Sequence, residues 1–316
     1  MADDFLHNHK EFFDLIRIVS EEQAIGPVLV EKDYWIMHCL YGLQQLGMRF
    51  ELKGGTSLSK GFGIINRFSE DIDIRIEPPK DMDVQTNPNK TKPAHVASRK
   101  AFYDHLADKI KIDGIESVER DANFDDANYR SAGIRLHYKS RTTPLRGLKD
   151  GILLEVGFDD VTPNFPKTIS SWAYDHTVTK TSVTDNRAID VACYHPGYTF
   201  VEKLQTISTK YRKQQEDGAF PANFMRHYYD AYRLLQEPLV HKFIGTPEYI
   251  AHKDKRFRTG DNPIIAENEA FLLSNPEIRK IYASAYAGSG ALYYKGQPAF
   301  EEILVALAEA VKIIGI

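Results

Sequence analysis

Hydrophobic side chains repeat at spacings of three and four residues through the first part of the chain. Val30, Tyr34 and Met37 belong to this pattern. Such a spacing places apolar side chains on one face of a helix. Because Gly47 supplies a stop signal, the pattern predicts that residues 1–47 are helical.

The pattern changes between about residues 48 and 198, where polar and apolar residues alternate in short runs. A period of two is typical of strands with one buried face. The runs with this pattern are MRFELKG, SEDIDIRIE, AGIRLHYKS, GILLEVGF and DNRAIDVACY. One helical stretch is predicted over roughly 93–112. The polar, Pro- and Asn-rich residues 78–93 predict a long surface loop.

Helical periodicity returns at about residue 199 and continues to the last stretch, PAFEEILVALAEAVKII, which is strongly amphipathic. Two earlier stripes carry the same period, Phe200/Leu204/Ile207/Tyr211 and Phe224/Tyr228/Tyr232/Leu235. Helices, a β-rich centre and a helical C-terminal half predict an α+β fold with a mixed β-sheet core. We expect two domains, over residues 1–198 and 199–316.

The composition is that of a globular protein with a nearly balanced charge. The 316 residues include 40 Lys and Arg against 44 Asp and Glu, so any contact with nucleic acid must come from a local basic patch. The 17 Phe and 17 Tyr exclude disorder as the main state. No apolar run approaches the roughly 18 residues of a membrane helix. Two isolated cysteines fit a reducing cytoplasm.

The most informative segment is FELKGGTSLSKGFGIINRFSEDIDIRI, at residues 50–76. In its second strand Ile72 and Ile74 share an apolar face, and Asp71 and Asp73 share the other. The two aspartate Cα atoms are then about 6.6 Å apart. Their carboxylates can converge on one cation or straddle two ions, which lie about 3.5–4 Å apart in two-metal sites. Oxygen ligands of this kind suit Mg²⁺ or Mn²⁺.

A glycine pair precedes this strand and suits a different ligand. Gly54 and Gly55 let the backbone approach a phosphate, and the N–H groups that open the next helix can bind the anion. Nearby hydroxyl and basic side chains could add donors: Thr56, Ser57, Lys60 and Arg67. A glycine turn or an Asp-x-Asp strand alone is more commonly structural, whereas the combination favours a phosphate and metal site.

Glu155 is a third candidate acid, because it interrupts the apolar run of GILLEVGF. The alternative is a surface glutamate on an edge strand. If Glu155 joined Asp71 and Asp73 with about 5 Å between charges, each pair would repel by about 3 kcal/mol at an effective dielectric constant of 20. Such a cluster needs a divalent cation or one protonated member.

The motif GGTSLSK followed by RFSEDIDI resembles the AbiEii/AbiGii-type family of nucleotidyltransferase toxins, a branch of the DNA polymerase β-like nucleotidyltransferase superfamily. Three later or earlier segments are similar to helical motifs of that family: VEKDYWI at 30–36, FVEKLQTI at 200–207 and RHYYDAYRLL at 226–235. The resemblance covers about residues 25–240. It implies a nucleotidyltransferase core and a helical C-terminal domain that closes the active-site cleft.

The resemblance also implies roles for particular residues. The triphosphate would be held by Gly54, Gly55, Thr56 and Ser57, with Ser69 beside the metal ligands. Asp71 and Asp73 would bind Mg²⁺ or Mn²⁺, and Glu155 would be the acid that activates the attacking hydroxyl. Lys203 would contact phosphate, and Asp230 would complete the site.

The implied partners are an NTP, an acceptor and a cognate antitoxin. The base of the NTP stays open between ATP, GTP, CTP and UTP. The acceptor is the 3′ end of tRNA in some members, and a protein is the other candidate. Two further functions stay open: a kinase-like transfer of the γ-phosphate to a protein, and a nucleotide-binding partner protein without turnover.

The residues themselves leave structural alternatives for the helical half. Lys203 flanks an apolar stripe, where lysine side chains commonly snorkel. Asp230 lies opposite its stripe and is predicted to be solvated or turned towards a cleft, with Arg226 as a candidate partner. Basic clusters that could contact RNA, or simply form solvated faces, are Lys90/Lys92/Arg99/Lys100, Lys203/Lys210/Arg212/Lys213 and His252/Lys253/Lys255/Arg256/Arg258.

Overall fold

The computed structural model describes residues 4–145, 147–221, 223–314 and 316. The chain divides into two compact units. The first contains residues 1–62 and 69–194, and the second contains residues 63–68 and 195–316. The short segment 63–68 therefore belongs with the C-terminal part of the chain, although it lies between two parts of the first unit.

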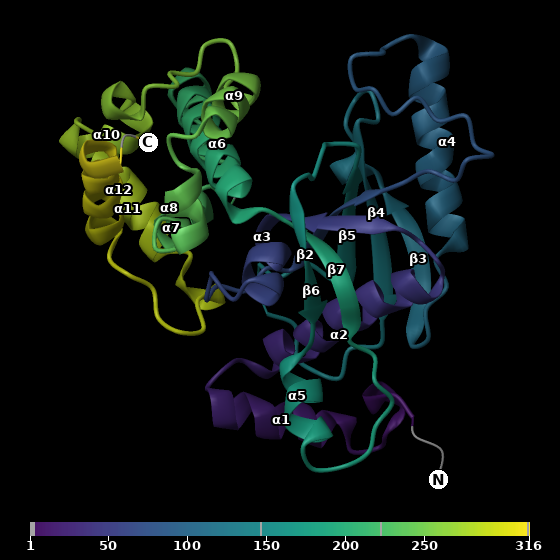
Figure 1. Cartoon of the computed structure of the whole chain (residues 1–316). Coiled ribbons are helices and arrows are strands. Elements are labelled where there is room, and N and C mark those ends of the chain that lie inside the picture. Colours follow the sequence, from purple (N-terminus) through teal and green to yellow (C-terminus); the bar gives the residue numbers. More distant parts are fainter. Residues whose placement is uncertain (1–3, 146, 222, 315) are drawn as a thin grey trace. The chain divides into compact units, whose positions relative to one another are not determined.

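The first unit is built on a mixed sheet, in which seven strands are found among the described residues in the order β3-β4-β5-β2-β1-β7-β6 (Figure 1). The strands are β1 (Phe50–Lys53), β2 (Asp71–Ile76), β3 (Ile115–Asp121), β4 (Ser131–Tyr138), β5 (Ile152–Gly157), β6 (Asn164–Ile169) and β7 (Ala188–Tyr194). β2 is antiparallel to β1 and parallel to β5. The predicted α+β fold with a mixed sheet is confirmed.

The alternation predicted for β2 is present in the structure. Ile72 and Ile74 are fully buried, and their side chains pack on the opposite face of the strand from Asp71 and Asp73 because side chains alternate along a strand. The register places Lys53 opposite Asp73 on one side and Glu155 opposite Asp73 on the other. Two acidic residues on neighbouring parallel strands therefore lie side by side at the centre of the sheet.

The helices of the first unit are α1 (Phe12–Gln23), α2 (Pro27–Gln45), α3 (Gly54–Thr56), α4 (Pro93–Lys109) and α5 (Trp172–Val178). α2 contacts β5 and β7, and α4 contacts β3 and β4. α2 is buried on most sides, so that even Glu31, Lys32 and Asp33 lie in the interior. Short 3₁₀ turns occur at Leu6–Asn8 and Ala122–Phe124.

The second unit is helical. Its helices are α6 (Pro196–Asp217), α7 (Arg226–Leu234), α8 (Pro238–Phe243), α9 (Pro247–Arg256), α10 (Glu269–Leu272), α11 (Pro276–Ala287) and α12 (Phe300–Ile314), with 3₁₀ turns at Ile265–Glu267 and Gly290–Leu292. The predicted stripe residues Phe200 and Leu204 are buried, and α6 contacts α7, α8, α9 and α10. α6 is thus the central helix of this unit.

The hydrophobic pattern of the sequence did not predict three short elements: β3, β6 and α5. β3 and β6 are the two edge strands of the sheet, and most of their side chains are at least partly exposed. β6 also contains Pro166, which is tolerated on edge strands. Strands of this kind carry little hydrophobic alternation, so their pattern does not stand out.

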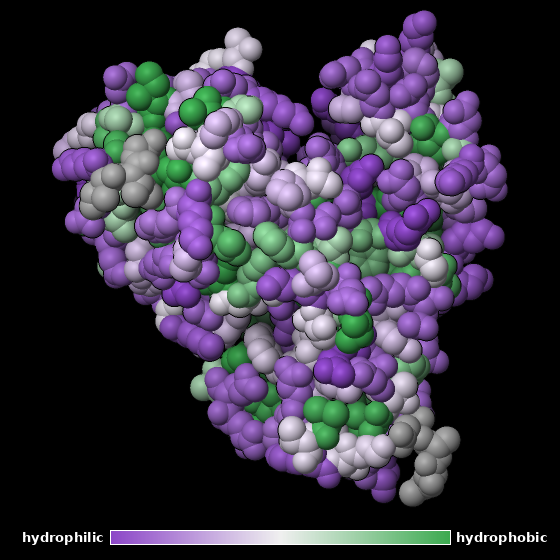
Figure 2. Space-filling view, in the orientation of Figure 1, coloured by the Kyte–Doolittle hydropathy of each residue, from purple (hydrophilic) through white to green (hydrophobic). Residues whose placement is uncertain are grey.

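The face of the molecule drawn in Figure 2 is mostly hydrophilic, with hydrophobic residues scattered among the polar ones. In the parts of the chain that the structure describes, no helix has the length and hydrophobicity that crossing a membrane requires.

Candidate active site

The glycine turn joins β1 directly to a short helical segment. Gly54 has a φ of +70°, a left-handed conformation that favours glycine. α3 begins at this residue and continues into a π-helical turn over Ser57–Gly61. The hydroxyl of Thr56 donates a hydrogen bond to the main-chain oxygen of Asp71 at 2.5 Å. This bond ties the turn to the first residue of the aspartate strand.

Gly54 and Asp73 lie in direct contact. A Cβ atom placed on Gly54 would be 2.0 Å from Oδ2 of Asp73, a separation that real structures do not show. Only a glycine at position 54 leaves room for this carboxylate. The structure therefore brings the glycine turn and the Asp-x-Asp strand together, as their combination in the sequence suggested.

Asp71 is the more buried of the two aspartates, with 5% of its surface exposed. Its Oδ2 accepts a hydrogen bond from Nζ of Lys149 at 2.7 Å. Its Oδ1 is buried and has no hydrogen-bond partner among the described residues. A buried carboxylate oxygen without a partner is costly, and a bound cation would satisfy it.

Glu155 lies beside Asp73 through the pairing of β5 with β2. Its side chain is 38% exposed, and its Oε1 is 3.9 Å from Nζ of Lys149. Ser69 is half-buried in the loop that precedes β2. The strand register thus places Asp73 against Gly54 and next to Glu155, and Lys149 lies between Asp71 and Glu155, all in the first unit.

The donor set fits a hard divalent ion, although the described residues contain no preformed group of three or more His, Cys, Asp or Glu side chains arranged around a metal position. Two observations carry the fit: the unpartnered Oδ1 of Asp71, and the carboxylate of Asp73, whose Oδ2 occupies the space that a side chain at Gly54 would fill. Carboxylate oxygens are the ligands that Mg²⁺ and Mn²⁺ prefer.

Lys149 was not predicted from the sequence. It lies in the loop between β4 and β5, two residues before Gly151, and nothing in the segment RGLKDG indicates a site. Its place depends on the pairing of β5 with β2, because that pairing carries the preceding loop to Asp71. Only the folded sheet could have identified it.

Lys60 makes a structural ion pair. Its Nζ is 2.8 Å from Oδ1 of the buried Asp33 and 5.0 Å from the ring centre of Trp172. The main-chain N–H of Trp172 donates to the other oxygen of Asp33 at 2.8 Å. Burial raises the pKa of Asp33, and the Lys60 charge acts in the opposite direction. The expected contact of Lys60 with phosphate stays a prediction, and it would require Lys60 to leave or share Asp33.

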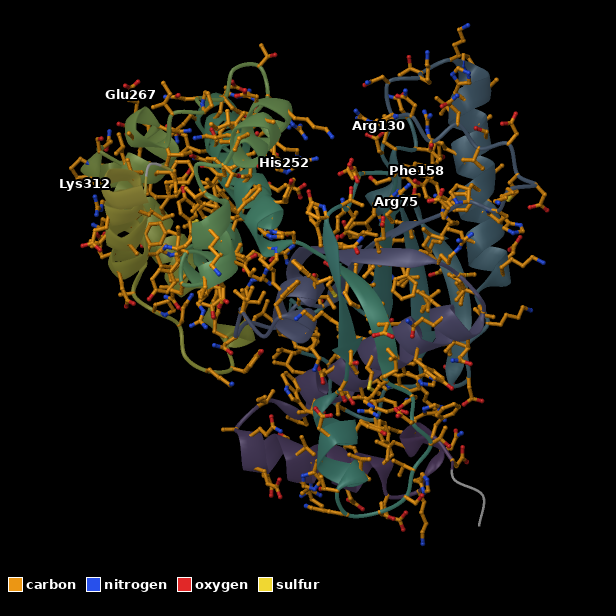
Figure 3. All side chains as sticks on the ribbon, in the orientation of Figure 1. Arg75, Arg130, Phe158, His252, Glu267 and Lys312 are labelled. Carbon is orange, nitrogen blue, oxygen red and sulfur yellow. The ribbon has the colours of Figure 1, made fainter. Side chains whose placement is uncertain are left out.

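Arg75 follows Asp73 on the same face of β2 and is labelled in Figure 3. Its guanidinium is 2.8 Å from Glu51 and 3.0 Å from Glu77. Glu51 and Glu77 neutralise Arg75, so Arg75 is not the counter-charge of Asp71, Asp73 and Glu155.

The helical unit contains a second charged group, centred on Asp230. Asp230 is fully buried and accepts from Nε and Nη2 of Arg67 at 2.7 Å each. Lys203 Nζ is 2.8 Å from its Oδ2. Burial alone would raise the pKa of Asp230, but Arg67 and Lys203 outweigh it and hold the value at about 2.

This arrangement corrects two expectations. Asp230 is not solvated or turned to a cleft, since no part of it is exposed. Its partners are Arg67 and Lys203 instead of Arg226. Arg67, expected near phosphate, directs its guanidinium to Asp230 and is 2% exposed. Roles of Arg67, Lys203 and Asp230 in binding or catalysis stay predictions.

Lys210 and Arg226 add positive charge beside this group, and His227 is a further buried neighbour. Burial lowers the pKa of Lys210 to about 8, and the charges of Arg226 and Lys203 add to the effect. His227 is buried, neither of its ring nitrogens has a partner among the described residues, and burial with the neighbouring cations lowers its pKa well below the ordinary value. The basic side chains Arg67, Lys203, Lys210 and Arg226 therefore outnumber Asp230 at this position, while His227 adds no charge.

The basic clusters differ in exposure. Arg99 is buried and donates to the main-chain oxygens of Gln85, Lys90 and Asn128, so it holds a loop instead of facing solvent. Lys255 on α9 is exposed, and so is Arg258, two residues after the end of that helix. His252 of the same helix, labelled in Figure 3, is partly buried.

The comparison with protein families identifies the chain. A family described as "Nucleotidyl transferase AbiEii toxin, Type IV TA system" matches residues 36–306. The chain belongs to this family. It is therefore a nucleotidyltransferase, and the AbiEii family places it among the toxins of type IV toxin–antitoxin systems.

A solved structure has a similar fold. MenT4, a nucleotidyltransferase toxin from Mycobacterium tuberculosis H37Rv, superposes with a TM-score of 0.55 at 15% sequence identity, over 93% of this chain and 87% of that one. A nucleotidyltransferase-like antigenic protein from Paracoccidioides brasiliensis gives a TM-score of 0.33 at 12% identity, over 80% and 92% of the two chains. A search of curated proteins gave no match.

Proposed function

We propose that this AbiEii protein is a metal-dependent enzyme that transfers NMP from an NTP to an acceptor hydroxyl, with the 3′ end of tRNA as the acceptor. The observation that carries the proposal is the contact between Gly54 and the carboxylate of Asp73, beside the unpartnered Oδ1 of Asp71. A phosphate-binding turn and an acidic edge in contact are what nucleotidyl transfer needs.

The site residues of the first unit each have a role in this proposal. Asp71 and Asp73 would hold Mg²⁺ or Mn²⁺, which when bound neutralises charge on the phosphates. The main chain of Gly54 and Gly55 would receive the triphosphate, with the hydroxyl of Ser57 as a further donor. Thr56 keeps the turn against β2 through its bond to Asp71.

The chemical step is an in-line displacement at the α-phosphorus. The acceptor oxygen forms the new P–O bond, the bond to the bridging oxygen breaks, and pyrophosphate leaves. Glu155 would accept the proton of the hydroxyl, since its side chain is 38% exposed and it lies next to Asp73 in the sheet. Holding the acceptor oxygen in line with the α-phosphorus can lower the barrier of such a reaction substantially.

A pair of labels tests the reaction. Total tRNA is incubated in Mg²⁺ with each of the four NTPs, labelled with ³²P at either the α- or the γ-phosphate. We expect label on RNA from the α-position only. Label from the γ-position on protein would instead indicate a phosphotransferase, and binding without any product would indicate a partner protein without turnover.

Matched carboxylate variants test the site. Asp73→Asn should lower the rate at least 100-fold, because it removes the charge that lies against the glycine turn. Asp83→Asn removes an exposed carboxylate from the loop after β2 and should leave the rate unchanged. Equal activity of the two variants would contradict the assignment of the site.

The exposed basic residues of α9 and its C-terminal end are the proposed contact for the RNA backbone. Lys255→Glu with Arg258→Glu should weaken tRNA binding, most at low salt, while NTP binding is retained. Lys280→Glu with Lys312→Glu changes the charge by the same amount on exposed residues of α11 and α12 and serves as the control. Equal tRNA affinity in both double variants would contradict this contact.

The toxin assignment supports an antitoxin as a partner. Expression of the chain alone should slow bacterial growth, and Asp73→Asn should remove that effect. Co-expression of the neighbouring open reading frame should restore growth to the wild-type chain. Failure of the neighbour to restore growth would contradict its role as the antitoxin.

A further inference from the structure

The ammonium group of Lys149 lies between two acids of the proposed metal site. It is 2.7 Å from Oδ2 of Asp71 and 3.9 Å from Oε1 of Glu155. The ring of Phe124 lies 4.6 Å from the same Nζ, in the range of a cation–π contact. Carboxylates on two sides and an aromatic face beside them make a binding position for one positive charge.

The main chain of Lys149 is held as firmly as its side chain. Its N–H donates to Oε2 of Glu70 at 2.7 Å, and its carbonyl oxygen accepts from Nζ of Lys32. Lys32 and Glu70 are themselves paired at 3.5 Å, and both are buried. A buried ion pair thus holds the Lys149 backbone at both its N–H and its C=O, so the lysine is not a surface side chain that reaches the site by chance.

The two oxygens of Asp71 have different surroundings. Oδ2 is taken by Lys149, and Oδ1 is buried without a partner among the described residues. Oδ2 of Asp73 occupies the space that a side chain at Gly54 would fill, on the same face of β2 as Asp71. The position for an added cation is therefore at the unpartnered Oδ1 of Asp71, with Asp73 as the second ligand, while the position between Asp71 and Glu155 already has a charge.

We propose that Lys149 is the resident cation of this site and takes the place of a second metal ion, so that the enzyme binds a single divalent ion at Asp71 and Asp73. This inference rests on the proposed function, since it concerns the same acids. Counted over Asp71, Asp73, Glu155 and Lys149 alone, the charges agree with it, because three carboxylates are balanced by one ammonium and one divalent ion. A second divalent ion beside Lys149 would leave an excess of positive charge before any nucleotide binds.

Counting bound Mn²⁺ tests the proposal without any measurement of activity. The full chain is titrated with Mn²⁺, and free Mn²⁺ is measured by electron paramagnetic resonance. We expect one bound ion in the wild type. Lys149→Met should bind its first ion about 10-fold more tightly, because a nearby positive charge is lost, and should take up a second ion in the vacated position.

Two variants separate the position of the charge from its loss. Lys149→Arg keeps a cation and should bind one ion, as the wild type does. Lys139→Met removes an exposed lysine at the start of the same loop and should change neither the number of ions nor the affinity. Two bound ions in the wild type, or one ion with unchanged affinity in Lys149→Met, would overturn the proposal.

A metal-free measurement keeps the proposal distinct from the proposed function. In EDTA, Asp71→Asn should lower the melting temperature of the wild type by roughly 2–4 °C, because Lys149 loses its partner. In the Lys149→Met background the same change should raise it, since it removes a buried carboxylate without a counter-charge. Additive effects would overturn the role of Lys149.

The two experiments fail in different ways. If neither the wild type nor Lys149→Met binds Mn²⁺, while the two substitutions show the opposite signs in EDTA, the metal-dependent reaction is wrong and the pairing of Lys149 with Asp71 stands. If Mn²⁺ binds and the effects of the two substitutions in EDTA are additive, the role of Lys149 is wrong and the metal-dependent reaction stands.

Discussion

Removing the charge of Asp230 is the most direct perturbation of the helical unit. Asp230→Asn keeps the size of the side chain but leaves Arg67 and Lys203 facing an amide. Arg67 is 2% exposed and cannot turn its guanidinium to water without unpacking its surroundings. The substitution thus strands a buried positive charge, which is the costly way of breaking an ion pair.

The magnitude follows from the contacts. Asp230 accepts two charge-assisted hydrogen bonds of 2.7 Å from Arg67, and Lys203 lies 2.8 Å away. Hydrogen bonds to charged groups contribute about 1.5–3 kcal/mol each, and the amide retains part of this. Removing one partner of a buried ion pair costs about 3–5 kcal/mol. We expect a loss of about 4 kcal/mol, or roughly 10 °C in melting temperature.

Chemical unfolding followed by circular dichroism measures this loss. Lys203→Met is the companion variant, because it leaves the bidentate pair between Arg67 and Asp230 intact and should cost only about 1–2 kcal/mol. An Asp230→Asn protein that is as stable as the wild type would refute the reasoning. If that stable variant were also inactive, Asp230 would belong to the chemistry and not to the core.

Three further predictions concern other parts of the chain. Gly54→Ala should lower activity at least 100-fold, because its Cβ would displace the Asp73 carboxylate. Gly47→Ala is the control: Gly47 has nearly the same left-handed φ (+71° against +70°) but open space around it, so this variant should lose stability and keep its activity. Burial lowers the pKa of His38 to about 4, so on acidification the unfolded chain binds a proton at His38 before the folded chain does. The free energy of unfolding should therefore be unaffected by His38 above pH 7 and should fall by about 2–3 kcal/mol as the pH drops from 6.5 to 4. In urea unfolding, the loss of stability between pH 7 and pH 5 should be smaller in His38→Gln than in the wild type, and an equal loss in both would count against this prediction. Burial lowers the pKa of Lys210 to about 8, so the charged lysine destabilises the folded state at pH 7. Lys210→Met should therefore raise the free energy of unfolding at pH 7 by about 1–2 kcal/mol, after allowance for partial exposure. Melting scans should show this gain shrinking between pH 8 and 10, and a gain that does not depend on pH would point to packing alone.

The central strands could be predicted because their physics is local. Ile72 and Ile74 alternate with acids, and a half-buried strand requires such a pattern. The glycines before it mark a turn for the same local reason, and the contact of Gly54 with Asp73 follows once β1 and β2 form a hairpin-like pair. The helical stripes of the C-terminal half are local as well.

The parts that could not be predicted depend on distant residues. Lys149 reaches Asp71 only through the pairing of β5 with β2, and Arg67 reaches Asp230 across 163 positions of the sequence. A helical pattern around Asp230 indicates which residues share a face, but not which basic residue lies opposite. For the same reason Arg226, four residues away on one helix, was an attractive and wrong partner.

The segment 63–68 makes the helical unit discontinuous in sequence. It carries Arg67, whereas Asp230 is supplied by α7 far downstream. A fragment that ends after β7 would retain an arginine whose counter-ion has been cut away, and a fragment that begins at α6 would retain the aspartate with Lys203 but without the bidentate arginine. Anyone who expresses either half separately should graft these six residues onto the C-terminal piece, or expect both products to aggregate.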